Sequence, residues 1–459
     1  MTLLETWLDV TREWDGVFPQ HRSAVRARRQ GLGALVCLGR RTLTRIIWTN
    51  GGAHRNWSSE YFLHSRVAWE PQELFSPIVA RGLGLCPGRL VGVAVDDTRL
   101  HKTGRCIQQA FHQRDPLSPP FHTNLILGLR FLQASLLVPL YKRASASCRA
   151  LPIRFEESSP VKRPSRRASE EQWSHYRLER KHHNLSTHFV EMTTRVRQDL
   201  DAAGGTDKVL VTVVDGSFCN RTVFTAPRDR TEIVARARKD AVLCERAPQG
   251  SRRFYGTQKF TPEQIRQDPA IPWKTARIHY GGKRRRVRYK VLPLVYWQGG
   301  ARRLPLRPII VAPTPYRKRH SGKLYYRMPA YLLTTDLVHS PKALLQIYFD
   351  RWQIEVNHRE EKDTLGVGQA QLWNPTAVSR QPVLVVAAYS ALLLAALLAF
   401  GPDRTNVYAQ LPKWRRNAKR PSCLDLIALL RQDINQHPQL LIPLDINTSP
   451  QAMVSSAAA

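Results

Sequence analysis

The chain has 459 residues and carries 70 Lys and Arg against 36 Asp and Glu, a formal net charge of +34. Its 42% hydrophobic residues provide enough apolar material for packed cores, which excludes disorder over most of the chain. A charge this far from neutrality calls for an anionic partner, either phosphodiester backbones or acidic membrane surfaces. Nucleic acid is the expected partner.

The compartment is expected to be a reducing one. The seven cysteines lie singly at wide spacing and form no Cys-x-x-Cys pair, which argues against a disulfide framework and a Cys-rich zinc site. The first residues include Glu5 and Asp9 but no early Lys or Arg, the reverse of a secretory signal. These features predict a cytoplasmic protein.

Residues 1–88 are predicted to form a helical domain. Four stretches have apolar residues at helical spacing: Leu3–Trp14, Leu32–Trp48, Ser58–Trp69 and Pro71–Ala80. Seven arginines are expected to lie between these helices: Arg22, Arg26, Arg28, Arg29, Arg40, Arg41 and Arg45. A solvated basic face explains them, but at this net charge a DNA-contacting domain is the favoured interpretation.

Two Val-rich runs are predicted to be buried strands that end in carboxylates. Leu90–Val95 is followed by Asp96 and Asp97, and Val209–Val214 is followed by Asp215. Between these strands the sequence predicts, in order, strands around 106–112 and 125–140, a loop or linker over 144–170, and one long polar helix over 170–203.

The second half of the chain begins with a β-rich and strongly basic region. From 224 to 335 short strand-like runs alternate with turns, and residues 281–330 contain 14 Lys and Arg and no Asp or Glu. Tyr331–Thr335 is predicted to be a strand. Ser340 as N-cap and Pro341 in the first turn then predict a helix that can run to Leu365.

One apolar segment raises the question of a membrane. Val383–Phe400 spans 18 residues in which only Tyr389 and Ser390 are polar, and as a helix it would be about 27 Å long. That length is marginal for a bilayer, and a helix buried on all sides has the same composition. We favour the buried helix; a membrane-associated basic protein is the alternative. Residues 403–459 are expected to form a basic C-terminal segment.

Four polar residues share one face of the helix that begins at Pro341. At about 100° per residue, Tyr348, Arg351, Glu355 and Lys362 fall within about 60° of one another around its axis. An exposed Arg351–Glu355 ion pair would explain this stripe without any function.

The two strand-terminal aspartates give the stripe a second interpretation. A carboxylate at the end of a buried strand is costly unless it is exposed or bound to a cation, although Asp is also frequent in turns. Asp96, Asp215 and Glu355 would together suit Mg²⁺ or Mn²⁺, and two such ions can promote phosphodiester displacement. Asp96 directly follows its strand, whereas Asp97 would point to the opposite face and is the reserve candidate.

The stretch from Tyr348 to Lys362 resembles the Y-(2)-R-(3)-E-(6)-K signature of the DDE transposases of bacterial insertion sequences, with every spacing intact. The order of the two aspartates before the glutamate is also similar, so the resemblance covers roughly residues 90–362. It implies a ribonuclease H-like α/β core with a mixed sheet. It also implies that Tyr348, Arg351 and Lys362 contact phosphate near the cleaved DNA end.

The sequence pattern and the resemblance together predict five segments. These are a helical DNA-binding domain (1–88), the first part of the core (89–240), a basic β-rich insertion (241–335), the last part of the core (336–402) and the C-terminal segment (403–459). The implied activity is metal-dependent cleavage of transposon ends and strand transfer by a dimer on double-stranded DNA. An endonuclease or resolvase without strand transfer, and a non-catalytic DNA-binding regulator, are the alternatives.

Overall fold

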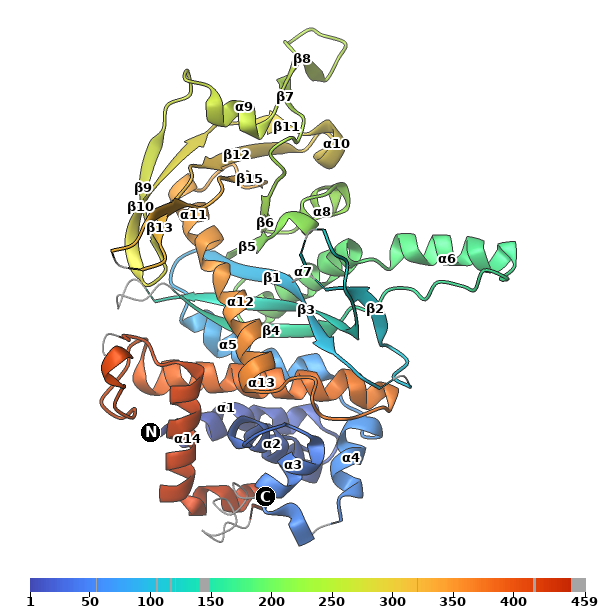
Figure 1. Ribbon diagram of the computed structural model, residues 1–459, viewed down its shortest axis with the longest axis vertical. Helices are drawn as coiled ribbons and strands as arrows, with labels where there is room; N and C mark the ends of the chain where they lie inside the picture. The colour runs from blue at the N-terminus through green and yellow to red at the C-terminus, as the bar shows by residue number, and fades with distance from the viewer. Residues whose placement is uncertain are drawn as a thin grey trace. The chain divides into compact units, whose positions relative to one another are not determined.

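The computed structural model of the chain describes residues 1–54, 56–104, 106–115, 118–119, 121–140, 148–319, 321–415 and 418–446. The chain divides into two compact units (Figure 1). Unit 1 comprises residues 1–86, 97–159 and 354–459, and unit 2 comprises residues 87–96 and 160–353. Strand β1 (Leu90–His101) and helix α12 (Trp352–Arg359) each contribute residues to both units. Residues 447–459 of the basic C-terminal segment lie outside the described residues.

Unit 1 begins with five helices, α1 (Leu3–Arg12), α2 (His21–Val36), α3 (Leu43–Thr49), α4 (Ser58–Ser65) and α5 (Ser76–Gly84). The prediction of a helix over Leu32–Trp48 was wrong, because α2 ends at Val36 and the chain turns through Gly39 at φ 69°. Thr42 then caps α3 by accepting a hydrogen bond from the Arg45 backbone. Arg28 and Arg29 lie within α2 and are buried, so these cations are not part of a solvated face.

Helix α13 (Pro375–Phe400) forms the core of unit 1. It packs against α1, α2, α4, α5 and strand β4 (Cys148–Glu157), and Trp7 Nε1 donates a hydrogen bond to the Ala388 carbonyl at 3.2 Å. The helix is long and apolar enough to cross a membrane, but 78% of its apolar window is buried inside the protein. The buried-helix prediction is confirmed. Helix α14 (Cys423–Gln436) follows it.

The β-structure of unit 1 is antiparallel. Strand β3 (Leu125–Pro139) pairs with β2 (Phe111–Arg114) through residues 125–128 and with β4 through residues 131–139. The Lys102 backbone N–H, just after β1, donates to the Leu127 carbonyl at 2.9 Å. The strand predicted around 106–112 begins only at Phe111, and the loop predicted over 144–170 contains β4.

Strand β4 could not be recognised in the sequence because it contains basic residues and a proline. Arg149 is buried, and its Nη2 donates to the Pro421 carbonyl at 2.9 Å. Pro152 lies where the register shifts between Ala134 and Ser135 of β3, a bulge that accommodates a residue without an N–H. Strand β4 is therefore a core strand although its composition is typical of a loop.

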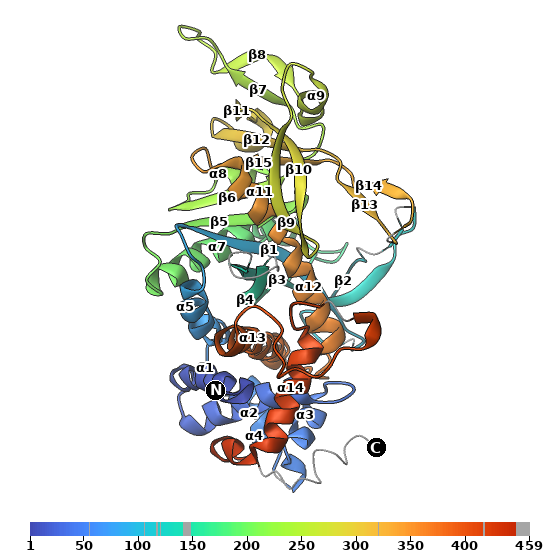
Figure 2. The same cartoon turned by 90° about the vertical axis from the view of Figure 1, so that its left-hand side faces the viewer.

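Unit 2 is built on a mixed sheet (Figure 2). The first half of β1 is parallel to β5 (Val209–Val214), and β5 is parallel to β6 (Thr231–Arg236). The antiparallel strands continue from β6 in the order β15 (Ala330–Thr334), β12 (Pro305–Val311), β11 (Val295–Tyr296), β7 (Leu243–Arg246) and β8 (Tyr255–Phe260). Strand β10 (Lys283–Val291) pairs with β12 and with β9 (Lys274–Tyr280), while β13 (Pro315–Arg317) and β14 (Leu324–Tyr326) pair with each other. The fold class is mixed α/β.

The helices of unit 2 are α6 (Glu170–His182), α7 (Leu185–Ala202), α8 (Arg221–Thr225), α9 (Pro262–Gln267), α10 (Gln298–Ala301) and α11 (Pro341–Asp350). The single helix predicted over 170–203 was wrong, because the chain breaks at His183 and the Asn184 side chain caps α7.

Shorter helical turns complete the two units. The 3₁₀ turns are Glu13–Val17, Gly52–His54, Pro71–Phe75, Gly216–Phe218, Lys413–Arg415 and Pro438–Leu444, and Glu360–Thr364 is a π-helical turn.

Candidate active site

Two of the predicted carboxylates belong to neighbouring parallel strands of unit 2. Asp215 directly follows β5 as predicted, but Asp96 lies within β1, so the prediction that the first Val-rich strand ends at this acid was wrong. The register pairs Leu90 with Val209 and continues to Ala94 with Val213. The same offset carried two residues further places Asp96 opposite Asp215, where β5 has just ended. The preceding Val95 and Val214 are fully buried. The two acids are therefore neighbours across β1 and β5, directly after the buried valines of both strands.

Arg351 lies beside the first of these acids. Its Nη1 is 3.4 Å from Asp96 Oδ2, and the two side chains are 15% and 18% exposed. Arg351 directly follows α11, which begins as predicted with the Ser340 side chain accepting from the Ala343 N–H at 3.3 Å. The partly shielded position strengthens the attraction between the two charges relative to a surface pair.

Asp215 also caps a turn. Its Oδ1 accepts hydrogen bonds from the Ser217 backbone N–H at 2.9 Å and from the Ser217 hydroxyl at 2.5 Å. Burial, together with the nearby Asp215 carboxylate, raises the pKa of Cys219 to about 12, so that thiol stays protonated at neutral pH. The turn-capping role that the sequence left open is thus present, and it uses one oxygen of the carboxylate.

Asp97 has different surroundings. Its Oδ2 is 3.4 Å from Arg99 Nη2, two residues further along the same strand. Because β1 continues to His101, successive side chains alternate, and Asp96 and Asp97 stand on opposite faces. Arg351 of the signature contacts Asp96, which favours Asp96 over Asp97 as the first metal ligand.

Helix α11 is hydrogen-bonded to and stacked on the basic strand β9. The Gln346 side chain accepts from the His279 N–H and donates to the His279 carbonyl, both at 2.9 Å. Tyr348 packs edge-on against Phe349 at 5.6 Å between ring centroids, and Phe349 stacks on Tyr280 at 4.7 Å. Sequence reasoning missed Gln346, because an amide on a helix looks like an ordinary solvated residue.

Glu355 and Lys362 belong to unit 1. Glu355 lies in α12, one helical turn after Arg351 along the chain, and is half-buried. Lys362 lies in the π-helical turn Glu360–Thr364, where i→i+5 bonding adds a residue to the turn. The single helix predicted from Pro341 to Leu365 was therefore wrong, because it is interrupted at Arg351 between α11 and α12 and its last turn is π-helical. The angular position assigned to Lys362 does not hold.

A buried polar network lies beneath the π-helical turn in unit 1. The Tyr389 hydroxyl donates to Glu360, and Asn357 Nδ2 donates to that hydroxyl at 3.1 Å and to the Ala150 carbonyl at 3.2 Å. Burial raises the pKa of the adjacent Glu361 to about 8. The feature of the sequence that could have indicated this network is Tyr389, one of only two polar residues in the apolar segment.

The basic block of residues 281–330 is largely at the surface of unit 2. Twelve of its 14 Lys and Arg are exposed. Of the other two, Lys290 is buried and donates to the Asp268 carbonyl at 2.5 Å, and Arg307 donates to the Leu337 and His339 carbonyls. Most of this charge is therefore available to an anionic partner.

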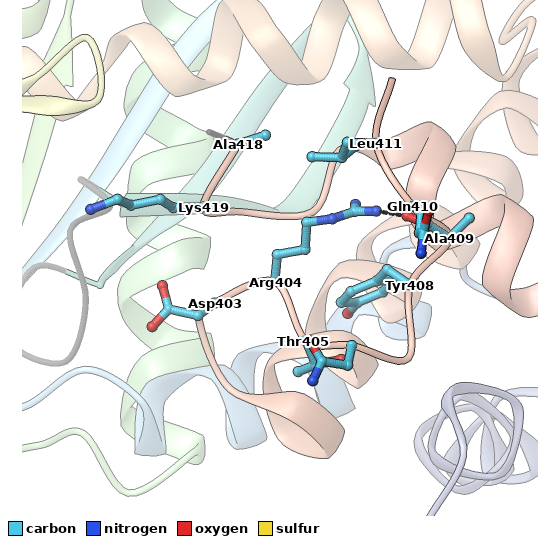
Figure 3. A pocket seen from close by; sticks show the side chains of 10 residues that line it. Asp403, Arg404, Thr405, Tyr408, Ala409, Gln410, Leu411, Ala418 and Lys419 are labelled. Atoms are coloured by element: carbon cyan, nitrogen blue, oxygen red, sulfur yellow. Dashed lines mark hydrogen bonds between the residues drawn. The ribbon is translucent and has the colours of Figure 1, made fainter. Parts of the chain in front are cut away.

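A cavity of about 650 Å³ opens next to the second aspartate. Gly216 and Cys219, which follow Asp215, form part of its wall, and Arg221, Arg238 and Lys259 supply cations. A second cavity, of about 790 Å³, lies in the C-terminal segment of unit 1, where Arg404, Tyr408 and Lys419 line it (Figure 3). The second cavity contains none of the predicted site residues.

The residues that could hold a metal are the predicted carboxylates. Hard divalent cations prefer oxygen ligands, and Asp96 and Asp215 supply them from adjacent strands. No group of three or more His, Cys, Asp or Glu side chains close enough to hold a metal occurs within the described ranges. In comparisons with known proteins, no family matches the chain and no curated protein is significantly similar to it.

Proposed function

We propose that the chain is a DNA transposase of the DDE type, which cleaves the ends of its element and joins them to target DNA. The observation that carries this proposal is the contact of Arg351 with Asp96. It brings a residue of the late helical signature to the first of the predicted acids, in the strand that pairs with the one leading to Asp215. A ribonuclease H-like core is part of the proposal.

Asp96, Asp215 and Glu355 are proposed to hold two divalent ions, Mg²⁺ or Mn²⁺. Bound there, the ions would activate the attacking oxygen and stabilise the leaving oxygen of a phosphodiester. The donor set fits such ions, since it consists of carboxylates alone. Cys219, which lies four residues after Asp215, is held protonated by burial and by that carboxylate and does not compete as a thiolate ligand.

Tyr348, Arg351 and Lys362 are proposed to hold phosphates near the cleaved end. Arg351 can present its planar guanidinium to a phosphate as well as to Asp96. The cavity beside Asp215 offers room for a strand, with Arg221, Arg238 and Lys259 in its wall. These cations would orient the DNA so that the scissile phosphate meets the carboxylates.

The reaction proceeds in two displacements. Water attacks the phosphodiester at the element's end and releases a 3′-hydroxyl, and that hydroxyl then attacks a phosphodiester of target DNA. Joining two ends requires two end-binding subunits, so a homodimer on double-stranded DNA in the cytoplasm is proposed. The first 88 residues would add DNA contacts through exposed cations such as Arg22 and Arg40.

The test uses a plasmid that carries the element with its flanking DNA, together with Mg²⁺ or Mn²⁺. Glu355→Gln is expected to abolish strand cleavage while end binding persists, and Glu171→Gln, an exposed residue of α6, is the matched control. Cleavage by the Glu355→Gln protein at the wild-type rate would refute the assignment. Precut ends that are never joined would indicate an endonuclease, and a wild-type protein that never cleaves would indicate a binding protein.

A further inference from the structure

Strands β13 and β14 continue the ladder of β12 and β15 beyond the sheet of unit 2 (Figure 2). The β12–β15 register ends with Val311 paired to Ala330, and the β13–β14 register runs from Pro315 paired to Tyr326 to Arg317 paired to Leu324. Every pair has the same sum of residue numbers, so one register runs through both ladders. The Arg327 N–H donates to the Thr314 carbonyl at 2.9 Å between them.

Prolines mark the place where this ribbon leaves the sheet. Pro313 and Pro329 lie between the two ladders, and a proline has no N–H to contribute to a ladder. Burial changes at the same place. Val311 and Ala330 are buried, whereas no described residue of 315–328 is buried. The ribbon is therefore not ordered by packing onto a core.

Both faces of the ribbon carry cations and aromatic rings. Tyr316 and Tyr325 pair across the strands with ring centroids 5.6 Å apart, Lys318 lies over Tyr325, and Arg327 lies over Tyr316. The opposite face carries Tyr326, which is 63% exposed. The cations of residues 315–328 are Arg317, Lys318, Arg319, Lys323 and Arg327, and this stretch contains no Asp or Glu.

The dimensions and charge of the ribbon indicate its partner. At the rise of an extended chain, the six residues from Ala312 to Arg317, of which the last three form β13, reach about 20 Å. This exceeds the depth of about 8.5 Å of the major groove of B-DNA, which admits a two-stranded ribbon. A-form RNA has a major groove too narrow for side chains to read. A second copy of the chain, at +34, would repel a ribbon of this charge.

We infer that the described residues 312–319 and 321–329 form a DNA-reading ribbon that enters the major groove of double-stranded DNA, with its cations on the phosphates that border the groove. This inference rests on the proposed function in taking duplex DNA as the substrate. The ribbon would add a contact with the major groove that the carboxylate site does not supply. An isolated two-stranded ribbon is marginally stable, and the groove would give its exposed rings and cations their partner.

The experiment measures binding of the full chain to a mixed-sequence duplex of about 40 base pairs across a range of salt concentrations. The ribbon variant is Lys318→Ser, Arg319→Ser, Lys323→Ser, and the matched control is Lys162→Ser, Arg166→Ser, Arg167→Ser. All six residues are exposed in unit 2. The ribbon variant is expected to bind about 10-fold or more weakly, with a salt slope lower by about 2 to 3 units. The control should keep the wild-type slope.

A second duplex, in which glucosylated 5-hydroxymethylcytosine fills the major groove, tests whether the ribbon binds in that groove. The wild-type protein should bind this duplex about 10-fold more weakly than the plain duplex, whereas the ribbon variant should not distinguish the two. Equal binding of both duplexes by the wild-type protein, or an equal loss in both triple variants, would overturn the inference. Failure of the proposed function is separate, because it appears as cleavage retained in Glu355→Gln and leaves these binding results unchanged.

Discussion

The guanidinium of Arg351 lies 3.4 Å from the carboxylate of Asp96, although the two residues are 255 positions apart in the chain. Arg351 directly follows helix α11, and Asp96 lies within β1, just after its buried part. The contact links two features that the sequence shows only separately, a helical signature and a strand-terminal acid. It also identifies the face of β1 on which chemistry is expected.

Asp96→Asn should abolish cleavage, whereas Asp97→Asn should leave it within about threefold of the wild-type rate. The reason is the pleat of β1, which directs Asp96 toward Arg351 and Asp97 toward Arg99. Cleavage of supercoiled plasmid with Mn²⁺ measures both. The reverse order of the two effects would assign the metal to Asp97.

Arg351→Gln should lower the cleavage rate by about 100-fold, the usual effect of removing a positioned electrostatic donor. Arg351→Lys should recover part of this loss, because it keeps the charge but not the planar fork that suits phosphate. Single-turnover cleavage of a bound end separates this effect from weaker binding. A Gln variant that cleaves at the wild-type rate would leave Arg351 with a structural role only.

The parts of the fold and site that could be predicted are those with a strong local pattern. The Val-rich runs before Asp96 and Asp215 are too short and too apolar for surface helices, and both are buried strands. Ser340-Pro341 is a clear helix start, and α11 begins there. The segment before Gly401 is apolar on every face, which predicts a helix buried on all sides, and it forms the core helix α13.

The parts that could not be predicted depend on tertiary contacts. Strand β4 was missed because Arg149 and Pro152 are typical of loops, and only the contact with Pro421 and the bulge in β3 explain them. The π-helical turn was missed because nothing local distinguishes it from an α-helix. Its polar partners, such as Tyr389, come from a different helix.

Arg29→Met should destabilise unit 1 by about 3–5 kcal/mol, the usual cost of breaking a buried ion pair. Arg29 donates to Glu60 in the interior of the helical part of unit 1, and both side chains are less than a tenth exposed. Arg22→Met, at an exposed position of the same helix, should change stability by less than about 0.5 kcal/mol. Calorimetric unfolding of both variants measures the difference. Equal changes in stability for the two variants would mean that the buried Arg29–Glu60 ion pair contributes no more than an exposed arginine of the same helix.

Unit 1 should lose stability in acid through His64. Burial lowers the pKa of His64 to about 3, and its Nε2 lies 2.7 Å from Gln30 Oε1. Between pH 6.5 and 3 the unfolded chain binds a proton that the folded chain does not. Folding therefore weakens by about 1.4 kcal/mol per unit as the pH falls through this window. His64→Gln should remove this slope in urea unfolding between pH 4 and 6.5, and an unchanged slope would show that other groups cause it.

Glu361 should contribute a slope of opposite sign, in a window that overlaps the His64 window between about pH 4.5 and 6.5. Burial raises its pKa to about 8, so the folded chain holds one more proton than the unfolded chain between about pH 4.5 and 8. The stability that this group contributes is fully present below pH 4.5 and is lost as the pH rises toward 8, by about 1.4 kcal/mol per unit. Neighbouring Glu360 and Lys362, together with Tyr389 and Cys423, are the charged or titratable groups around it.

Glu361→Gln mimics the protonated side chain and should remove this loss. Hydrogen exchange of a peptide covering residues 352–365 measures the effect locally, with each variant compared with the wild-type protein at the same pH. At pH 8.5 the Gln variant should protect this peptide more strongly than the wild-type protein, and at pH 5 the two should be equal. Glu171→Gln on the exposed α6 is the control and should match the wild-type protein at both values. Equal protection of all three proteins at pH 8.5 would contradict the prediction, because it would show that ionisation of Glu361 does not weaken the turn that carries Lys362.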